Sequence, residues 1–222
     1  MTRTALCAFA LTLTILAAGA ASAFDLSGVS RSLDTSPPEG TDALLTTQSN
    51  LKSELAGTLG GLRTSQSSMA KTLGDATGAS RLMDMAGSLA GGGVGEGLVG
   101  KAMDMVMGYN QKLDNSGDKL AALGEKGQES IADSLLSYAK AANKLGLLDD
   151  KLLDAADQVQ TLLEKASALQ SASLMDRFSF LISTAPQVPD LASSASSTGK
   201  GLLDFCRSAG QNVSAAAKLL GY

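Results

Sequence analysis

The chain has 222 residues, with 18 Lys and Arg against 22 Asp and Glu, a formal net charge of −4 and no histidine. Without histidine, a nucleophile cannot be activated by a Ser-His-Asp or Cys-His arrangement, and the commonest metal ligand is missing. Aromatic residues make up 4% of the chain and tryptophan is absent. Because no cluster of lysines or arginines stands out either, the composition disfavours nucleic-acid grooves and stacking platforms for sugars or bases.

The N-terminus has the pattern of a cleaved export signal. Arg3 precedes an uncharged apolar run over residues 5–18, and Ala21-Ser22-Ala23 forms a small-x-small cleavage site. The apolar run is shorter than the roughly 20 residues that span a bilayer. The sequence therefore predicts a signal peptide over residues 1–23, a mature chain that begins at Phe24, and a periplasmic or secreted bacterial protein.

Cysteine usage limits the covalent links in the exported chain. Of two cysteines, Cys7 lies within the predicted signal peptide, so only Cys206 remains in the mature protein. A disulfide within the chain is therefore not expected. A single thiol in an oxidising compartment is either buried or bonded to another chain, and the sequence leaves both alternatives open.

The first half of the mature chain predicts an extended leader and three helices. Residues 24–40 form the leader, which ends in the breaker cluster 36–40, and Thr41 is the expected N-cap of the first helix. Leucines 44, 51, 55, 59 and 62 recur at helical spacing. Further helical patterns cover residues 79–90 and 94–113, on either side of a glycine-rich turn near residues 91–97.

The second half predicts several more helices. Patterns at 118–123 and 129–145 precede Gly146, a candidate C-cap, and Asp149 is the expected N-cap of a helix over residues 149–170. This helix carries a narrow apolar seam, formed by Leu152, Ala156, Val159, Leu163 and Ala166. An apolar segment at 174–182 stops before a polar linker near 186–199, and a final helix covers residues 200–220.

No long alternation of apolar and polar residues indicates a β-strand. We therefore expect an all-α protein, an irregular bundle of about five to seven helices in a single domain over residues 41–222. The paired carboxylates of the 149–157 region are explained by helix capping and the helix dipole, so they do not indicate a catalytic pair.

Five of the eight methionines lie close together in the sequence, at Met83, Met85, Met103, Met105 and Met107. Thioether sulfurs in an exported protein are suitable ligands for Cu(I). Residues two apart lie on opposite sides of a helix, however, so a Met-x-Met pair does not converge on one ion. We favour the interpretation that these side chains fill the core, and keep a Cu(I) site as an alternative.

Small residues at Gly87, Gly91 and Gly95 form a ladder that would permit close helix packing. Charged residues interrupt the surrounding segment, residues 81–108, so it is too short to span a bilayer. We expect a turn or close packing here, and insertion of residues 87–108 into a membrane surface is the alternative.

One stretch resembles a known family. The pattern Phe178-Ser179-x-Leu181-x4-Pro186-x-Val188-x2-Leu191, with the Leu- and Ala-rich stretch before it, is similar to the C-terminal motif of a family of small secreted bacterial helical proteins. The similarity covers residues 159–191. It implies export and a helical body, and because the family has no established activity, it implies no functional residue.

Together these features predict a non-enzymatic helical protein of the bacterial envelope that acts by packing against a protein partner or a second copy of itself. No cofactor is expected. The alternatives are a membrane-surface or lipid-associated amphipathic protein and a Cu(I)-binding protein.

Overall fold

The computed structural model describes residues 37–90 and 95–222, and the side chain of Leu169 is not described. The predicted signal peptide, most of the predicted leader and residues 91–94 of the glycine-rich turn lie outside the described residues. Within the described part, every regular element is a helix and no strand occurs. The all-α prediction is confirmed.

The helices follow one another with short connections. They are α1 (Thr41–Thr72), α2 (Ala76–Ala90), α3 (Glu96–Asp114), α4 (Gly117–Ala121), α5 (Glu125–Lys165), α6 (Ala168–Arg177), α7 (Ser179–Thr184), the 3-10 turn η1 (Ala185–Gln187), α8 (Val188–Ser208) and α9 (Ser214–Leu219). In the described part of the chain, α4, α7 and α9 have only five or six residues each, and the other six α-helices have ten or more.

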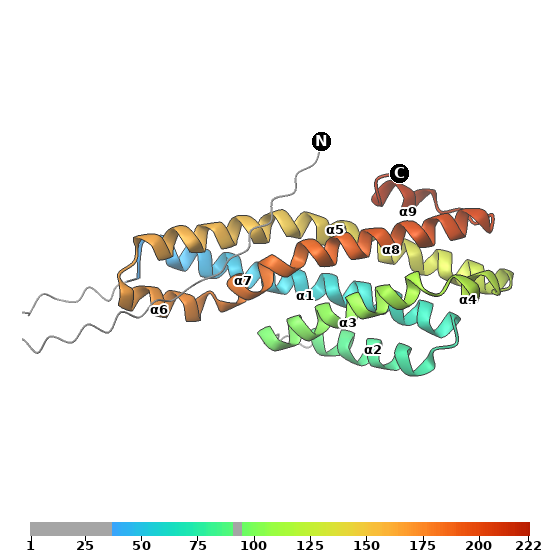
Figure 1. Ribbon diagram of the computed structural model, residues 1–222, viewed down its shortest axis with the longest axis horizontal. Coiled ribbons are helices and arrows are strands. Elements are labelled where there is room, and N and C mark those ends of the chain that lie inside the picture. The colour runs from blue at the N-terminus through green and yellow to red at the C-terminus, as the bar shows by residue number, and fades with distance from the viewer. Residues whose placement is uncertain (1–36, 91–94) are drawn as a thin grey trace, which may run out of the picture. The chain divides into compact units, whose positions relative to one another are not determined.

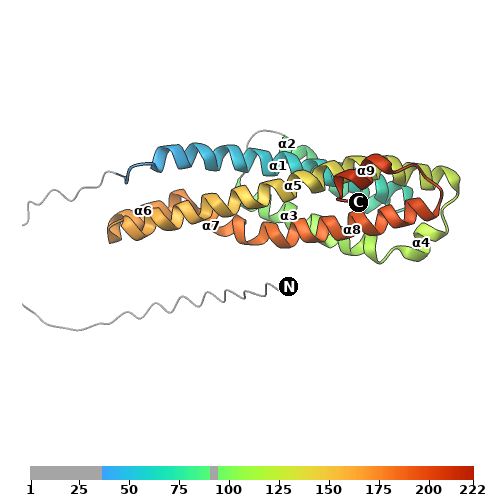
Figure 2. The ribbon, with the colours of Figure 1, turned by 90° about the horizontal axis from the view of Figure 1, so that it is seen from above.

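Three long helices form the centre of residues 35–222. Figure 1 and Figure 2 show α1, α5 and α8 along a common direction, with α5 antiparallel to the other two. Helices α2 and α3 form an antiparallel pair on the C-terminal half of α1 (Figure 1). Helix α6 follows the end of α5 that lies away from α4 (Figure 1), and Gln48 Nε2 of α1 donates to the carbonyl of Arg177 at the end of α6.

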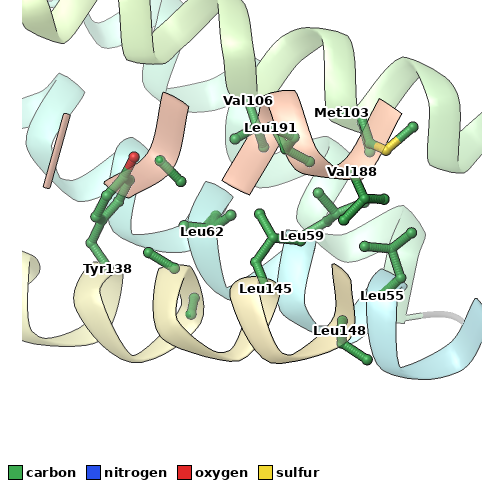
Figure 3. Close-up of a cluster of buried hydrophobic side chains, with 14 of the residues drawn as sticks. Leu55, Leu59, Leu62, Met103, Val106, Tyr138, Leu145, Leu148, Val188 and Leu191 are labelled. Atoms are coloured by element: carbon green, nitrogen blue, oxygen red, sulfur yellow. The ribbon is translucent and has the colours of Figure 1, made fainter. Parts of the chain in front are cut away.

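The core lies where α1, α3, α5 and α8 meet (Figure 3). Side chains from all four helices are at most 1% exposed there, among them Leu55, Leu59, Leu62, Met103, Val106, Tyr138, Leu145, Leu148, Val188 and Leu191. Removing a leucine side chain of this kind from water contributes roughly 1.5–3 kcal/mol. The leucine stripe predicted for the first helix is therefore the face that joins α1 to the other three helices.

The break predicted between residues 145 and 149 does not exist. Helix α5 continues through Gly146, which has no positive φ, and through Asp149, so neither residue caps a helix. A glycine in a helix interior costs roughly 1 kcal/mol. Leu145, Leu148 and Leu152 are at most 1% exposed on the same helix, and their burial outweighs that cost.

The predicted seam of the 149–170 region is correct only in part. Leu152 and Val159 are buried, as expected, but Ala155 rather than Ala156 lies between them in the core. Leu163 and Ala166 are only partly buried, because fewer helices surround this end of α5.

The polar linker predicted near residues 186–199 is wrong, since α8 begins at Val188 and runs through it. Pro186 and Pro189 lie in the first turns of η1 and α8, where the missing N–H is not needed. The small residues of this stretch allow α8 to pack closely against its neighbours instead. A Cβ added to Gly199 would lie 3.0 Å from Leu220 of the C-terminal region.

Two helix ends also differ from expectation. The predicted helix over 200–220 is divided, because Gly210 adopts a φ of +76° and the N–H groups of Gly210 and Gln211 bond back to Arg207 and Cys206. At the start of α1, Gly40 rather than Thr41 is the N-cap, and the Thr41 hydroxyl donates to the carbonyl of Pro38.

Candidate functional site

A cluster of polar side chains lies inside the bundle and joins all four core helices. The amide oxygen of Asn110 on α3 accepts hydrogen bonds from Gln66 Nε2 on α1, at 2.8 Å, and from the Tyr138 hydroxyl on α5, at 2.7 Å. Asn110 Nδ2 donates to the Ser194 hydroxyl of α8 at 3.0 Å. Gln66 Nε2 also donates to the carbonyl of Val106 at 3.0 Å. We call Gln66, Asn110, Tyr138 and Ser194 the interior polar cluster.

The interior polar cluster has no group that exchanges protons at neutral pH. Burial raises the pKa of Tyr138 far above its ordinary value, so its phenol stays protonated. Amides and hydroxyls supply the remaining atoms. The Thr198 hydroxyl lies beside that of Tyr138 without forming a hydrogen bond of good geometry, and Gln66 Oε1 has no partner either. The cluster therefore fixes how the helices pack, and does not indicate acid–base catalysis.

A buried arginine lies one turn before the cluster on α1. Arg63 is fully buried, and its Nη2 lies 3.0 Å from the sulfur of Met105 on α3. Its Nε and Nη1 have no hydrogen-bond partner. Desolvation lowers the pKa of Arg63 to about 10. A buried cation without a carboxylate partner is unfavourable for stability.

The candidate methionines lie in different surroundings. Met103 is in the core of Figure 3, Met83 is 42% exposed on α2, and Met105 contacts the Arg63 guanidinium. Met85 and Met107 are partly buried at the margin of the core. A guanidinium at the sulfur of Met105 repels a second cation there. In the described part of the structure, no group of three His, Cys, Asp or Glu residues could hold a metal ion either.

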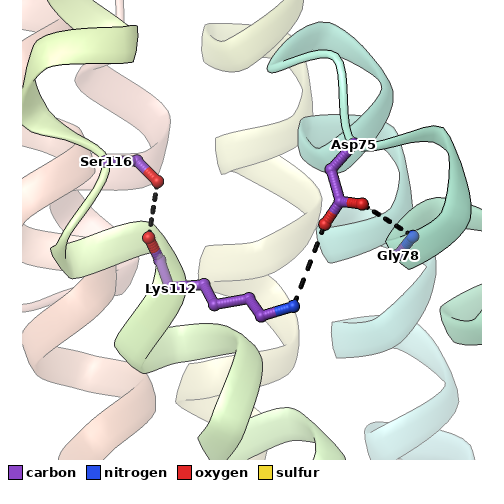
Figure 4. A network of polar contacts seen from close by, with 4 residues as sticks. All are labelled: Asp75, Gly78, Lys112 and Ser116. Carbon is purple, nitrogen blue, oxygen red and sulfur yellow. Dashed lines mark hydrogen bonds and ion pairs between the residues drawn. The ribbon is translucent and has the colours of Figure 1, made fainter.

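An open hollow of about 690 Å³ lies beside the ends of α1 and α3. Asp75 and Lys112 face each other across it, with Asp75 Oδ2 4.0 Å from Lys112 Nζ (Figure 4). The other oxygen of Asp75 accepts from the N–H of Gly78 at 2.8 Å and so caps α2. The Ser116 hydroxyl donates to the carbonyl of Lys112 (Figure 4). The hollow has charged side chains, but Asp75 and Lys112 already pair with each other.

A second, smaller cavity of about 370 Å³, partly open to solvent, lies between α8 and the connection from α3 to α4. Its walls combine leucine and phenylalanine side chains with one carboxylate and two hydroxyls, and consist of Leu113, Asp114, Gly117, Leu120, Ser197, Thr198, Gly201, Leu202 and Phe205. Thr198 brings this cavity next to the interior polar cluster. We call it the α3–α8 cavity.

Comparison with known proteins adds no assignment. No family model matches the chain, and neither a curated protein nor a solved structure is significantly similar to it. The resemblance of residues 159–191 to a secreted helical family therefore stays a prediction.

Neither the interior polar cluster nor the α3–α8 cavity was predicted from the sequence. Gln66 continues the spacing of Leu55, Leu59 and Leu62 along one face of α1, and this is the signal that marks it as buried. Which residues meet Gln66 depends on the packing of helices far apart in the sequence.

Proposed function

We propose that this protein is an exported, non-enzymatic helical protein of the bacterial envelope that acts by packing its helices against a protein partner or a second copy. The observation that carries the proposal is the position of its exposed apolar side chains. Four large ones lie on the consecutive helices α5, α6 and α7: Leu147 (62% exposed), Leu153 (39%), Met175 (52%) and Ile182 (43%). Large apolar side chains left exposed on helices that follow one another in the chain are candidates for an interaction site.

The chemistry of the described residues supports a role in binding rather than catalysis. The interior polar cluster is neutral, and the paired Asp75 and Lys112 are engaged in helix capping and with each other. The carboxylate pairs of the 149–157 region lie on the continuous helix α5. Export rests on the signal peptide predicted from the sequence.

The two alternatives have less support. In residues 81–90 and 95–108 the apolar face is used in packing, since Leu82, Leu89, Val99 and Val106 are buried, which leaves little of it for a lipid surface. Among the described helices, none is both long enough and apolar enough to cross a bilayer. A Cu(I) site would need the methionine sulfurs to converge on one ion, but these side chains lie in different surroundings on α2 and α3.

The experiment replaces exposed apolar side chains on the proposed surface and on a control surface. We expect Met175→Ser combined with Ile182→Ser to leave the melting temperature nearly unchanged, because both side chains are exposed. The double variant should no longer bind the partner or associate with a second copy. Crosslinking in envelope fractions measures partner binding, and sedimentation of the purified protein measures self-association.

Met83→Ser is the control, since Met83, at 42%, is about as exposed as Ile182, at 43%, but lies on α2. It should retain the crosslinked species. If wild type forms no crosslinked or self-associated species, or if the double variant retains all of them, the proposed surface is wrong.

A further inference from the structure

We propose that the α3–α8 cavity is a binding site for a small hydrophobic amine, a ligand with an apolar ring or chain and one ammonium group. This inference is independent of the partner surface on α5, α6 and α7. Its volume, about 370 Å³, is within the range of about 300–1,000 Å³ that is usual for small-molecule sites. It also has their composition, an apolar wall with a few polar groups.

The charge of the cavity selects a cation. Asp114 is the single charged residue among those that line it, and no lysine or arginine belongs to the lining. Among the described residues, Asp114 has no ion pair within 4.0 Å. An anionic ligand would therefore meet an uncompensated carboxylate, whereas an ammonium would be attracted to it.

The position of Asp114 is unfavourable for the helix that carries it. Asp114 is the last residue of α3, where the negative end of the helix dipole disfavours a carboxylate. The charge of Asp114 also reaches the interior of the bundle. Burial is the largest cause of the raised pKa of Tyr138, and the negative charge of Asp114 raises it further. A carboxylate that opposes the helix dipole and lines a cavity is explained by a cationic ligand better than by the stability of α3.

The polar and apolar groups of the cavity suit the two parts of such a ligand. Leu113, Leu120 and Phe205 offer an apolar wall. The Ser197 hydroxyl, which is exposed among the residues that line the cavity, can accept a hydrogen bond from an ammonium N–H, whereas the Thr198 hydroxyl is buried beside Tyr138. In the hollow beside Asp75 and Lys112, by contrast, the carboxylate already pairs with a lysine. The residues that line that hollow carry charges of both signs.

Two of the residues that line the cavity, Gly117 and Gly201, are glycines. A Cβ added at Gly117 or at Gly201 would meet no atom within 4 Å. Gly201 lies in the interior of α8, where a glycine is unfavourable compared with most other residues. A larger side chain at this position would occupy the cavity and would also favour the helix, so Gly201→Leu separates loss of the site from loss of the fold.

The test uses the purified mature chain labelled with 15N and titrated at pH 7 with benzylamine, benzyl alcohol and benzoate. We expect saturable shifts of amide signals from residues 113–120 and 197–205 with benzylamine, in about the millimolar range for so small a ligand. Benzyl alcohol should bind at least about threefold more weakly, because it lacks the charge, and benzoate should not bind.

Two variants and a control complete the test. Asp114→Asn should weaken benzylamine binding at least about threefold, and Gly201→Leu should weaken it more than about tenfold, since the side chain fills the space. Gly57→Leu, at an exposed helical glycine of α1 with equally open surroundings, should bind like wild type.

The proposal is overturned if wild type shows no saturable benzylamine binding. It is also overturned if benzoate binds as well as benzylamine, or if Gly201→Leu binds with wild-type affinity. Circular dichroism of each variant shows whether the helices are retained, and Asp114→Asn, an exposed substitution, tests the charge even if Gly201→Leu is unfolded.

Discussion

Asn110 is the residue on which the interior polar cluster depends. It accepts from Gln66 and Tyr138 and donates to Ser194, so one side chain satisfies groups on three other helices. Asn110→Ala leaves the Tyr138 hydroxyl and one N–H of Gln66 without partners, at about 1–3 kcal/mol each, and should lower the free energy of unfolding by about 3 kcal/mol. Tyr138→Phe removes one donor and should cost about 1 kcal/mol.

Urea denaturation of the two variants measures both values. Asn50→Ala is the control, because Asn50 is exposed on α1 and its loss should change stability by less than about 0.5 kcal/mol. Equal costs for Asn110→Ala and Tyr138→Phe would show that Asn110 is not the shared partner.

Cys206 is buried, and burial raises the pKa of its thiol from 9.0 to about 11. A raised folded-state pKa means that the folded state holds the proton more strongly than the unfolded state. This thiol therefore contributes stability that is complete below pH 9 and is lost as the pH rises from about 9 to about 11. We expect Cys206 to react with an aromatic disulfide at pH 8 at the rate of unfolding, and rapidly in urea.

Rapid labelling of the folded protein at pH 8 would contradict this expectation. An accessible thiol would also restore the alternative that Cys206 forms a disulfide between chains, which the buried position disfavours.

At the scale of elements, the continuity of α5 distinguishes the fold from the sequence-based expectation. Gly146 lies in the helix interior with a negative φ, exposed and with open space around it. Gly146→Ala should therefore raise the free energy of unfolding by about 0.5–1 kcal/mol, since alanine favours a helix over the flexible unfolded chain.

Gly210→Ala is the matched control, because Gly210 ends α8 with a φ of +76°, and it should lower stability by about 1 kcal/mol. Thermal and urea unfolding measure both. A destabilising effect of Gly146→Ala similar to that of Gly210→Ala would indicate that α5 ends near residue 146.

At the scale of the whole molecule, stability is not uniform along the bundle. The centre of α1 is packed between α5 and the α2–α3 pair, and Leu55, Leu59, Leu62 and Met69 have no exposed area. Helix α6 has Leu174 as its one buried side chain among those described, and a capping box formed by Ser167 and Gln170 stabilises its N-terminus.

We therefore expect amide hydrogen exchange to be slowest in residues 55–69 and much faster in α6, since local opening of α6 exposes little apolar surface. Mass spectrometry of exchanged peptides measures the difference. Equal protection of α6 and the centre of α1 would show that the bundle opens only as one unit.

Local patterns predicted the parts of the fold that depend on local periodicity. The leucine stripe of α1 and the patterns at 79–90 and 94–113 correspond to α1, α2 and α3, because an amphipathic face is visible in a single helix. The predictions failed where the burial of apolar side chains stabilised a helix more than the local sequence favoured a turn. Gly146, Asp149 and the small residues of 186–199 are compatible with turns, yet each lies in or next to a helix whose burial outweighs that preference.

The sequence by itself determined the helical class and excluded histidine-based chemistry, since both follow from periodicity and composition. Only the tertiary structure decided that Gln66, Asn110, Tyr138 and Ser194 meet, and that Asp114 and Gly201 line one cavity. Gln66 and Ser194 are 128 positions apart in the sequence, and Asp114 and Gly201 are 87 positions apart. Periodicity places a side chain on a helix face, but the way the helices pack selects which side chains share that space.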